Sequence, residues 1–246
     1  MIQGIIFDYG GTIDTNSRHW SEVLWEGYQQ VGIPISKEEF RTSYVAAERA
    51  LARHPYIEPH HDFHYLLKIK CDIETSDLVE RGVWSIGEEE RKALSDKVAD
   101  YCYQYVLEIL KTSRPIIEKL AKKFPLVLVS NFYGNIETIL ADFKLQYFQH
   151  IIESAVVGVR KPDPQIFQLG VDALRQVTKK SETELPANDI LVVGDSFSKD
   201  IEPATKIGCQ TVWIKGEGWG EEKTNDSIPT HIIYNISELE GLLISN

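Results

Sequence analysis

The chain has 246 residues, of which 43% are hydrophobic and 26% charged, and its formal net charge is −11. This composition is typical of a globular protein, and the acidic balance disfavours binding to nucleic acid or an anionic membrane, so we expect neither partner. No apolar run has the length of a membrane span, and residues 1–4 do not begin a secretion signal. Three widely spaced cysteines form no metal-binding pattern and fit the reducing cytoplasm, where we expect the protein to be located: Cys71, Cys102 and Cys209.

A short apolar strand over residues 4–8 is the first predicted element, and the pattern then changes to helix. Apolar residues recur at helical spacing in four stretches, at 19–31, 37–52, 62–71 and 88–110. A capping box of Ser36 and Glu39 marks the start of the second stretch. Because residues 16–110 contain little strand signal, we expect them to form an all-helical cap domain.

From residue 111 onward, short apolar strands alternate with amphipathic helices. We expect strands at 126–129, 151–152, 155–157, 190–193 and 211–214, helices at 116–124, 135–143, 164–177 and 201–207, and a last short pair at 232–233 and 237–243. This alternation predicts a parallel sheet covered on both faces. The fold class is therefore α/β, with a Rossmann-like three-layer core of mostly parallel strands built from residues 1–15 and 111–246. Hinges toward the cap are expected near 16–17 and 112–114.

Polar side chains follow three of the predicted strands directly. Asp8, Ser130 and Asp195 each come immediately after an apolar run, and the carboxyl ends of parallel strands meet at the ligand-binding edge of such sheets. We therefore expect these three side chains to converge. Lys161 and Asp200 lie in loops that reach the same edge.

This set of residues suits phosphoryl chemistry on a metal ion. A carboxylate such as Asp8 can attack phosphorus and form an acyl phosphate that water later cleaves. Mg²⁺ prefers oxygen ligands, and Asp8 and Asp195 would supply two of them, the backbone carbonyl of Gly10 a third, and Asp200 a water-mediated contact. Lys161 would neutralise the phosphoryl oxygens.

Other groups of these loops would bind the phosphoryl oxygens of the substrate. The hydroxyl of Ser130 and the backbone amides that follow each strand can donate hydrogen bonds to them. The substrate-binding positions are therefore expected at Gly11, Thr12 and Asn131.

These motifs, in this order, resemble the four motifs of the haloacid dehalogenase-like hydrolase superfamily. The resemblance covers about residues 1–15 and 111–220, and the helical stretch lies where that family inserts its first type of cap. It implies the following roles: nucleophile for Asp8, phosphate-binding hydroxyl for Ser130, motif-three lysine for Lys161, motif-one threonine for Thr12, and magnesium-binding acids for Asp195 and Asp200.

Gly10 departs from the pattern of the family's phosphatases. They usually carry a second aspartate two residues after the nucleophile, as the general acid and base, where this chain has glycine. Glycine cannot transfer a proton, although its carbonyl can still bind a metal, and general acid–base catalysis contributes about 10²–10⁴-fold in rate. Asp14 or a side chain of the cap could take over the proton transfer.

We therefore expect a magnesium-dependent phosphohydrolase that acts on a small phosphorylated metabolite through an aspartyl-phosphate on Asp8. The alternative is a weak or inactive family member that binds metal and phosphate for regulation. A carbon–phosphorus bond hydrolase is a further alternative, because such relatives also have a small residue at this position and use a cap lysine, for which Lys68 and Lys70 are available. Carbon–halogen cleavage is disfavoured, since Tyr9 is one place too early and the metal-binding acids are present.

Four of the seven histidines lie close together within the expected cap, at His54, His60, His61 and His64. Histidine can transfer protons near neutral pH and can bind metals. Their spacing matches no established metal-binding pattern, so we expect an exposed polar loop here.

Overall fold

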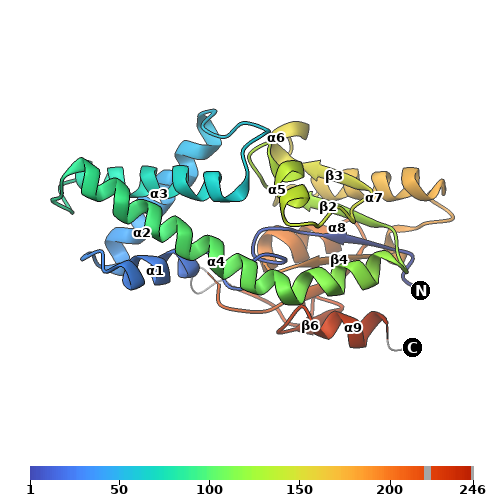
Figure 1. The fold of residues 1–246 in the computed structure, drawn as a ribbon. Helices are drawn as coiled ribbons and strands as arrows, with labels where there is room; N and C mark the ends of the chain where they lie inside the picture. The colour runs from blue at the N-terminus through green and yellow to red at the C-terminus, as the bar shows by residue number, and fades with distance from the viewer. Residues whose placement is uncertain (219–222, 245–246) are drawn as a thin grey trace.

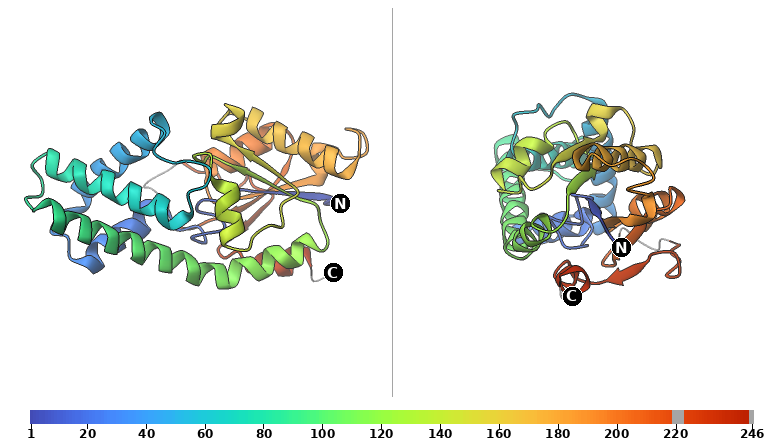
Figure 2. Two further views of the ribbon diagram at one scale, coloured as in Figure 1. Left: turned by 45° about the horizontal axis from the view of Figure 1, so that its top comes forward. Right: turned by 90° about the vertical axis from the view of Figure 1, so that its right-hand side faces the viewer.

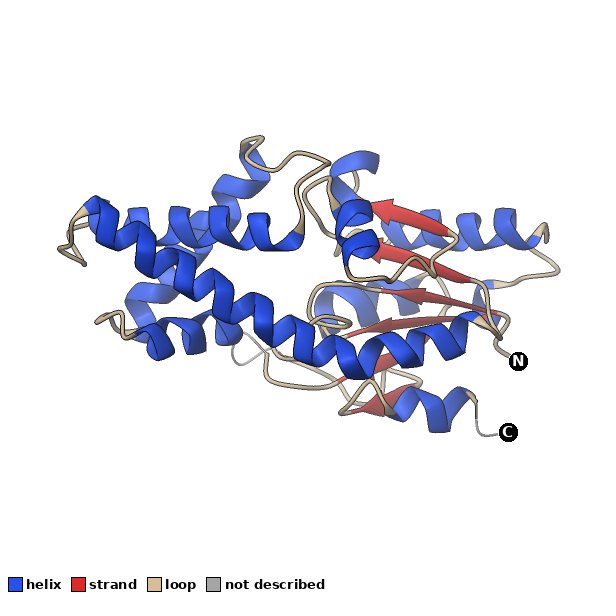
Figure 3. Cartoon of the chain, in the orientation of Figure 1, coloured by secondary structure: helices blue, strands red, loops and turns tan. Residues whose placement is uncertain are grey.

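Six parallel strands form the central sheet of the molecule, drawn as red arrows in Figure 3. The computed structural model describes residues 1–218 and 223–244 of the chain. In sheet order the strands are β3 (His150–Glu153), β2 (Leu126–Ser130), β1 (Gly4–Phe7), β4 (Ile190–Gly194), β5 (Gln210–Ile214) and β6 (His231–Ile233). The strand order reverses between β1 and β4, and open α/β sheets bind ligands beyond the carboxyl ends of the strands at such a point.

Helices cover both faces of the sheet. Ile5 and Phe7 of β1 belong to one buried cluster and Ile6 to another, as the alternation of side chains along a strand requires. The first cluster is covered by α4 (Glu88–Ala121), α5 (Ile136–Asp142) and α9 (Glu238–Leu243), and the second by α7 (Gln165–Thr178) and α8 (Glu202–Lys206), as Figure 2 shows. The predicted fold class, a three-layer α/β core with a parallel sheet, is confirmed.

Helices alone form the other part of the described chain, which lies beyond the carboxyl ends of the strands (Figure 1). It comprises α1 (Trp20–Val31), α2 (Lys37–Arg53), α3 (Phe63–Glu80) and the first half of α4. The predicted capping box of α2 is present: the Glu39 amide donates to Ser36 Oγ (3.2 Å), and the Ser36 amide donates to Glu39 Oε2 (2.7 Å). These helices form the expected cap.

Helix α4 continues through the point where the sequence predicts a break. The predicted end at Leu110 and the new helix after Pro115 are wrong, because α4 runs unbroken to Ala121. Pro115 removes only one backbone donor, and the buried residues Ile116 and Ile117 continue the apolar face onto the sheet, so their burial outweighs the proline's penalty. The division of the chain at residues 15/16 and 110/111 stays a prediction, and both its second boundary and the expected hinge at 112–114 fall inside this helix.

Two other predicted elements differ from the structure. Helix α3 extends to Glu80 rather than ending near Cys71, because buried Glu74, Thr75 and Leu78 continue its inward face. The stretch 155–157, predicted as strand, belongs to the short helix α6 (Ser154–Val157), so β-branched composition misled the assignment. The short helical turns η1 (Ala187–Asp189) and η2 (Phe197–Ile201) flank β4. Within residues 1–218 and 223–244, no helix combines the length and the hydropathy that crossing a membrane requires.

Glu74 is a fully enclosed carboxyl group inside the cap. Its Oε2 accepts a hydrogen bond from the Tyr28 hydroxyl (3.1 Å), and its Oε1 has no hydrogen-bond partner among the described residues. Burial raises the pKa of Glu74 from 4.5 to about 7, although nearby Lys70 acts in the opposite direction. The folded protein therefore binds a proton at Glu74 more tightly than the unfolded chain does.

We expect Glu74→Gln to remove a pH-dependent part of the stability. Because the pKa of Glu74 is raised in the folded state, its proton stabilises the fold fully below pH 4.5. This contribution to the unfolding free energy, about 3 kcal/mol, is lost as the pH rises toward 7. Relative to the wild type, the variant should thus gain unfolding free energy as the pH rises through this window, measured by urea denaturation. Glu80→Gln, on the exposed side of the same helix, is the matched control. Parallel pH profiles for wild type and Glu74→Gln would contradict the expectation.

Candidate functional site

Asp8 is held rigidly at the end of β1. Its backbone amide donates to Val193 O (2.9 Å) of the neighbouring strand β4, and its side chain is buried. Oδ1 accepts a hydrogen bond from Lys161 Nζ (2.6 Å), and Oδ2 accepts one from Thr12 Oγ1 (2.9 Å). Both oxygens are therefore oriented, as a carboxylate that reacts or coordinates must be.

Lys161 joins two of the aspartates. Its Nζ lies 2.6 Å from Asp8 Oδ1 and 2.6 Å from Asp200 Oδ1, and the ammonium also lies over the Phe167 ring, 5.3 Å from its centroid. Burial alone would lower the pKa of Lys161, but Asp200 and Asp8 outweigh it and raise that pKa. The side-chain amide of Asn131 holds the loop, because Asn131 Oδ1 accepts the Lys161 amide (2.9 Å) and Nδ2 donates to the Lys161 carbonyl (3.1 Å).

Three aspartates gather around this lysine. Asp8, Asp195 and Asp200 each offer one carboxylate oxygen, and these oxygens lie within 4.8 Å of one another. Burial and the neighbouring carboxylates raise the pKa of Asp8 and of Asp195, in spite of the nearby Lys161. Three acids thus face one ammonium in a buried place. An oxygen-rich, net negative site of this kind fits a hard divalent cation such as Mg²⁺.

The two glycines after Tyr9 differ in their surroundings. Gly11 has a φ of +98°, and a Cβ placed there would lie 2.4 Å from Asp195 Oδ2, so only glycine lets the turn approach this aspartate. A Cβ at Gly10 would meet no atom within 4 Å. Position 10 therefore has room for a side chain, and the turn itself does not require glycine there.

A cavity of about 1170 Å³ opens between the strand ends and the cap. Asp8, Gly10, Ser130, Asp195 and other residues after the strands line its floor, and its remaining walls include the α2 residues Tyr44, Glu48 and Leu51 and the following His54, Pro55 and Ile57. The cavity brings the predicted catalytic and metal-binding residues to one surface. It also places side chains of the cap opposite them.

Glu48 and Tyr133 also line the cavity, and no motif in the sequence marks either of them. Glu48 accepts a hydrogen bond from Lys70 Nζ, and its Oε2 accepts one from the Tyr133 hydroxyl (3.1 Å), which ties the cap to the loop after β2. Burial alone would raise the pKa of Glu48, but the Lys70 ammonium outweighs it and lowers that pKa. The sequence does place Tyr44 and Glu48 four residues apart, so that both lie on one face of α2, and this spacing could have indicated that they share one environment.

The cap lysines do not favour carbon–phosphorus cleavage. Lys70 is buried against Glu48, which raises the pKa of the lysine although burial acts against this, so the amine stays protonated and is not a nucleophile. Lys68 faces Asp96 at 3.9 Å near the surface.

Asp14 supports the turn rather than facing the cavity. Its Oδ1 accepts the Gly11 amide (2.7 Å), its Oδ2 accepts Trp20 Nε1–H (3.1 Å), and it does not line the cavity. Burial raises the pKa of Asp14 to about 7. Asp14 is thus a brace between the turn after β1 and the start of α1, and it is poorly placed to exchange a proton with a molecule in the cavity.

Comparisons with known proteins agree with this geometry. A family model described as haloacid dehalogenase-like hydrolase matches residues 2–208. The glyceraldehyde 3-phosphate phosphatase of Pyrococcus abyssi is 26% identical over 221 residues, which are 87% of this chain and 82% of that protein. The (S)-2-haloacid dehalogenase of Pseudomonas fluorescens is 24% identical over 250 residues, covering 100% of this chain and 98% of that protein.

Two further similarities are partial or structural. The 5-amino-6-(5-phospho-D-ribitylamino)uracil phosphatase YigB of Escherichia coli is 27% identical over 139 residues, so the match spans 56% of this chain and about half, 53%, of that protein. The crystal structure of the HAD-hydrolase YfnB from Bacillus subtilis bound to magnesium has a TM-score of 0.58 at 20% identity, over 98% of each chain. At this identity the structural similarity supports the fold alone.

We expect Gly11→Ala to disturb the aspartate cluster, whereas Gly10→Ala should not. The methyl group at position 11 would displace the Asp195 carboxylate and strain the backbone, which should lower the unfolding free energy by about 1–3 kcal/mol and weaken Mg²⁺ binding. The change at position 10 should stay within about 0.5 kcal/mol. Urea denaturation and calorimetric Mg²⁺ titration measure both effects. Equal behaviour of the two variants would refute the assigned role of Gly11.

Proposed function

This chain belongs to the haloacid dehalogenase-like hydrolase family, and we propose that it is a magnesium-dependent phosphohydrolase acting on a small phosphorylated metabolite. The single observation that supports this most is the buried cluster in which Lys161 bridges Asp8 and Asp200 beside Asp195. These three aspartates would hold the magnesium ion, together with the carbonyl of Gly10. When bound, the ion would offset the negative charge that phosphoryl oxygens bring into the site.

Asp8 would act as the nucleophile. Its carboxylate attacks phosphorus, the bond from phosphorus to the leaving oxygen breaks, and an aspartyl-phosphate forms on Asp8. Lys161 and Thr12 fix the orientation of the attacking carboxylate, and Lys161 also neutralises the phosphoryl oxygens. Ser130, which lines the cavity at the end of β2, would donate its hydroxyl to the same oxygens. Water then attacks the phosphorus and frees phosphate and Asp8.

Glu48 is our candidate for the proton transfer that Gly10 cannot perform. Four carboxylates line the cavity among the described residues. Glu48 comes from the cap, whereas Asp8, Asp195 and Asp200 follow strands of the core. Because Lys70 lowers its pKa, Glu48 is ionised at neutral pH and suits a base that activates water better than an acid that protonates a leaving group. Substrates whose leaving group departs without protonation, such as acyl phosphates, should therefore be cleaved best.

The relatives support the substrate class. Two of them are phosphatases whose names specify small phosphorylated metabolites, glyceraldehyde 3-phosphate and a phosphoribitylamino-uracil. A dehalogenase is also similar over the whole chain, but three clustered aspartates are better suited to a metal and a phosphoryl group than to carbon–halogen cleavage. We propose no nucleic-acid or membrane partner, and the cytoplasmic location stays a prediction.

Replacing the nucleophile should abolish turnover. We expect Asp8→Asn to reduce Mg²⁺-dependent hydrolysis of acyl phosphates and phosphate monoesters on the order of 10³-fold or more, because the amide cannot form the covalent intermediate. Released inorganic phosphate is the measurement. The proposed reaction would be wrong if the wild type showed no turnover above this variant on a broad panel of phosphate compounds.

Restoring a carboxylate at position 10 distinguishes an active enzyme from a weak or inactive relative. We expect Gly10→Asp to change the wild-type rate by less than about tenfold, because a cap residue already moves the proton; Gly10→Asn, of the same size, is the control. In a Glu48→Gln background, whose rate we expect to be about 10²-fold lower, Gly10→Asp should restore activity. A large rise from a near-zero wild-type rate would instead identify the alternative, a member kept for metal and phosphate binding.

A further inference from the structure

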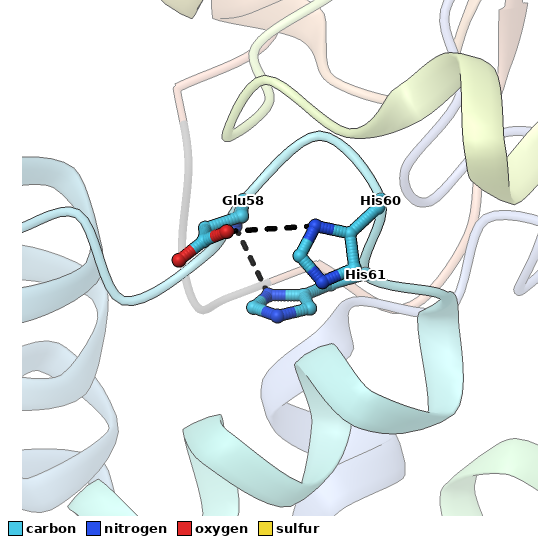
Figure 4. Close-up of side chains that lie close together, drawn as sticks. All are labelled: Glu58, His60 and His61. Carbon is cyan, nitrogen blue, oxygen red and sulfur yellow. Dashed lines mark hydrogen bonds and ion pairs between the residues drawn. The ribbon is translucent and has the colours of Figure 1, made fainter.

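The loop between α2 and α3 brings Glu58, His60 and His61 together at the surface of the cap. Figure 4 shows the three side chains turned toward one another on one bend of the chain. His60 Nδ1 lies 3.5 Å from Glu58 Oε2, and each of the three residues offers a ligand atom within 4.8 Å of the other two. The spacing along the chain follows no familiar motif, so the bend of the backbone, and not the sequence pattern, creates this cluster.

We propose that Glu58, His60 and His61 bind a divalent transition-metal ion such as Zn²⁺, at a site separate from the aspartate cluster. Two imidazoles and one carboxylate are the donor set of zinc sites that keep a position open for water, whereas the aspartate cluster offers only the oxygen ligands that Mg²⁺ prefers. Ligands about 2.1 Å from a tetrahedral ion lie about 3.4 Å apart. The observed separation of His60 Nδ1 and Glu58 Oε2 is already close to this value.

The ring of His61 presents an unprotonated nitrogen. Its Nδ1 accepts the backbone N–H of Glu58 (3.0 Å), so the proton of the neutral ring is on Nε2. Coordination through Nδ1 exchanges this hydrogen bond for a metal bond and needs no loss of a proton. The ring also packs on Tyr65, with 3.9 Å between the centroids, which limits its rotation.

The backbone of this loop is anchored to the core. The Pro59 carbonyl accepts a hydrogen bond from Thr138 Oγ1 (2.6 Å), and the His61 carbonyl accepts one from Asn135 Nδ2 (2.9 Å). The main chain is thus fixed from one side, while Glu58 and His60 are exposed to solvent on the other. A fixed backbone with accessible ligands lowers the ordering cost of binding an ion.

The same loop forms part of the wall of the large cavity. Pro55 and Ile57 line that cavity a few residues before the cluster, so an ion at Glu58, His60 and His61 would stiffen a segment that faces the substrate. The ion would therefore act on the position of the cap rather than on the reaction itself. The metal site does not depend on which reaction the aspartate cluster performs.

Cobalt titration of the full chain tests the proposal. With Mg²⁺ in excess, we expect the wild type to bind one equivalent of Co²⁺ with a visible absorption band, and Zn²⁺ to displace it. His60→Ala should lose this equivalent, and His64→Ala should retain it, because His64 is outside the cluster and bonds to Asp100 (2.6 Å). Circular dichroism checks that both variants fold.

Three results would overturn the site. They are wild-type protein that binds no Co²⁺ in the presence of Mg²⁺, His60→Ala and Glu58→Gln proteins that bind it as the wild type does, or loss of the Co²⁺ equivalent in Asp195→Asn, which would place the ion among the aspartates. Phosphate release by the His60→Ala protein distinguishes the two proposals, because a protein that lacks this metal site should still catalyse the Mg²⁺-dependent hydrolysis.

Discussion

A single ammonium group holds together carboxylates that would otherwise repel one another. Lys161 contacts Asp8 and Asp200 in a place that is almost closed to solvent, where charges interact strongly and where unpaired ones are destabilising. A buried arrangement of this kind persists only if its members cannot move apart. The strand end at Asp8 and the paired hydrogen bonds between Asn131 and the Lys161 backbone provide that restraint. Asp195 adds a negative charge that Lys161 alone does not balance, and this excess charge gives the site its suitability for a divalent cation.

The residues of this cluster could be predicted because their signals are local. Asp8, Ser130 and Asp195 each follow an apolar strand, and a parallel sheet brings such positions to one edge whatever the sequence between them. The contacts of the Asn131 side chain could not be predicted in this way. Contact with the substrate stays a prediction for Asn131, which lines the cavity, but the hydrogen bonds of its side chain to the backbone of Lys161, thirty residues away, had no signal in the sequence. Which atoms a polar side chain contacts depends on loop geometry that no pattern encodes.

The sequence predicts that a helical cap is present, but it does not predict which residues the cap contacts. Helical periodicity identified its helices, but their lengths and ends depend on what they pack against: α4 continues past Pro115 because the sheet buries its apolar face. The positions of Glu48, Tyr133 and the Glu58–His61 bend are set by packing between segments far apart in the chain. Those are also the parts of the molecule where specificity for one substrate would reside, so the sequence indicates the chemistry more readily than the substrate.

Helix α4 has 34 residues and is therefore a rod about 50 Å long. One end rests on the sheet through Ile116, Ile117 and Leu120, and the other end packs with α1 and α3. A tilt of about 5° where the rod rests on the sheet would carry its far tip through about 4 Å. A small change in how these three residues pack on the sheet would therefore shift the cap and alter the width of the cavity above the aspartates.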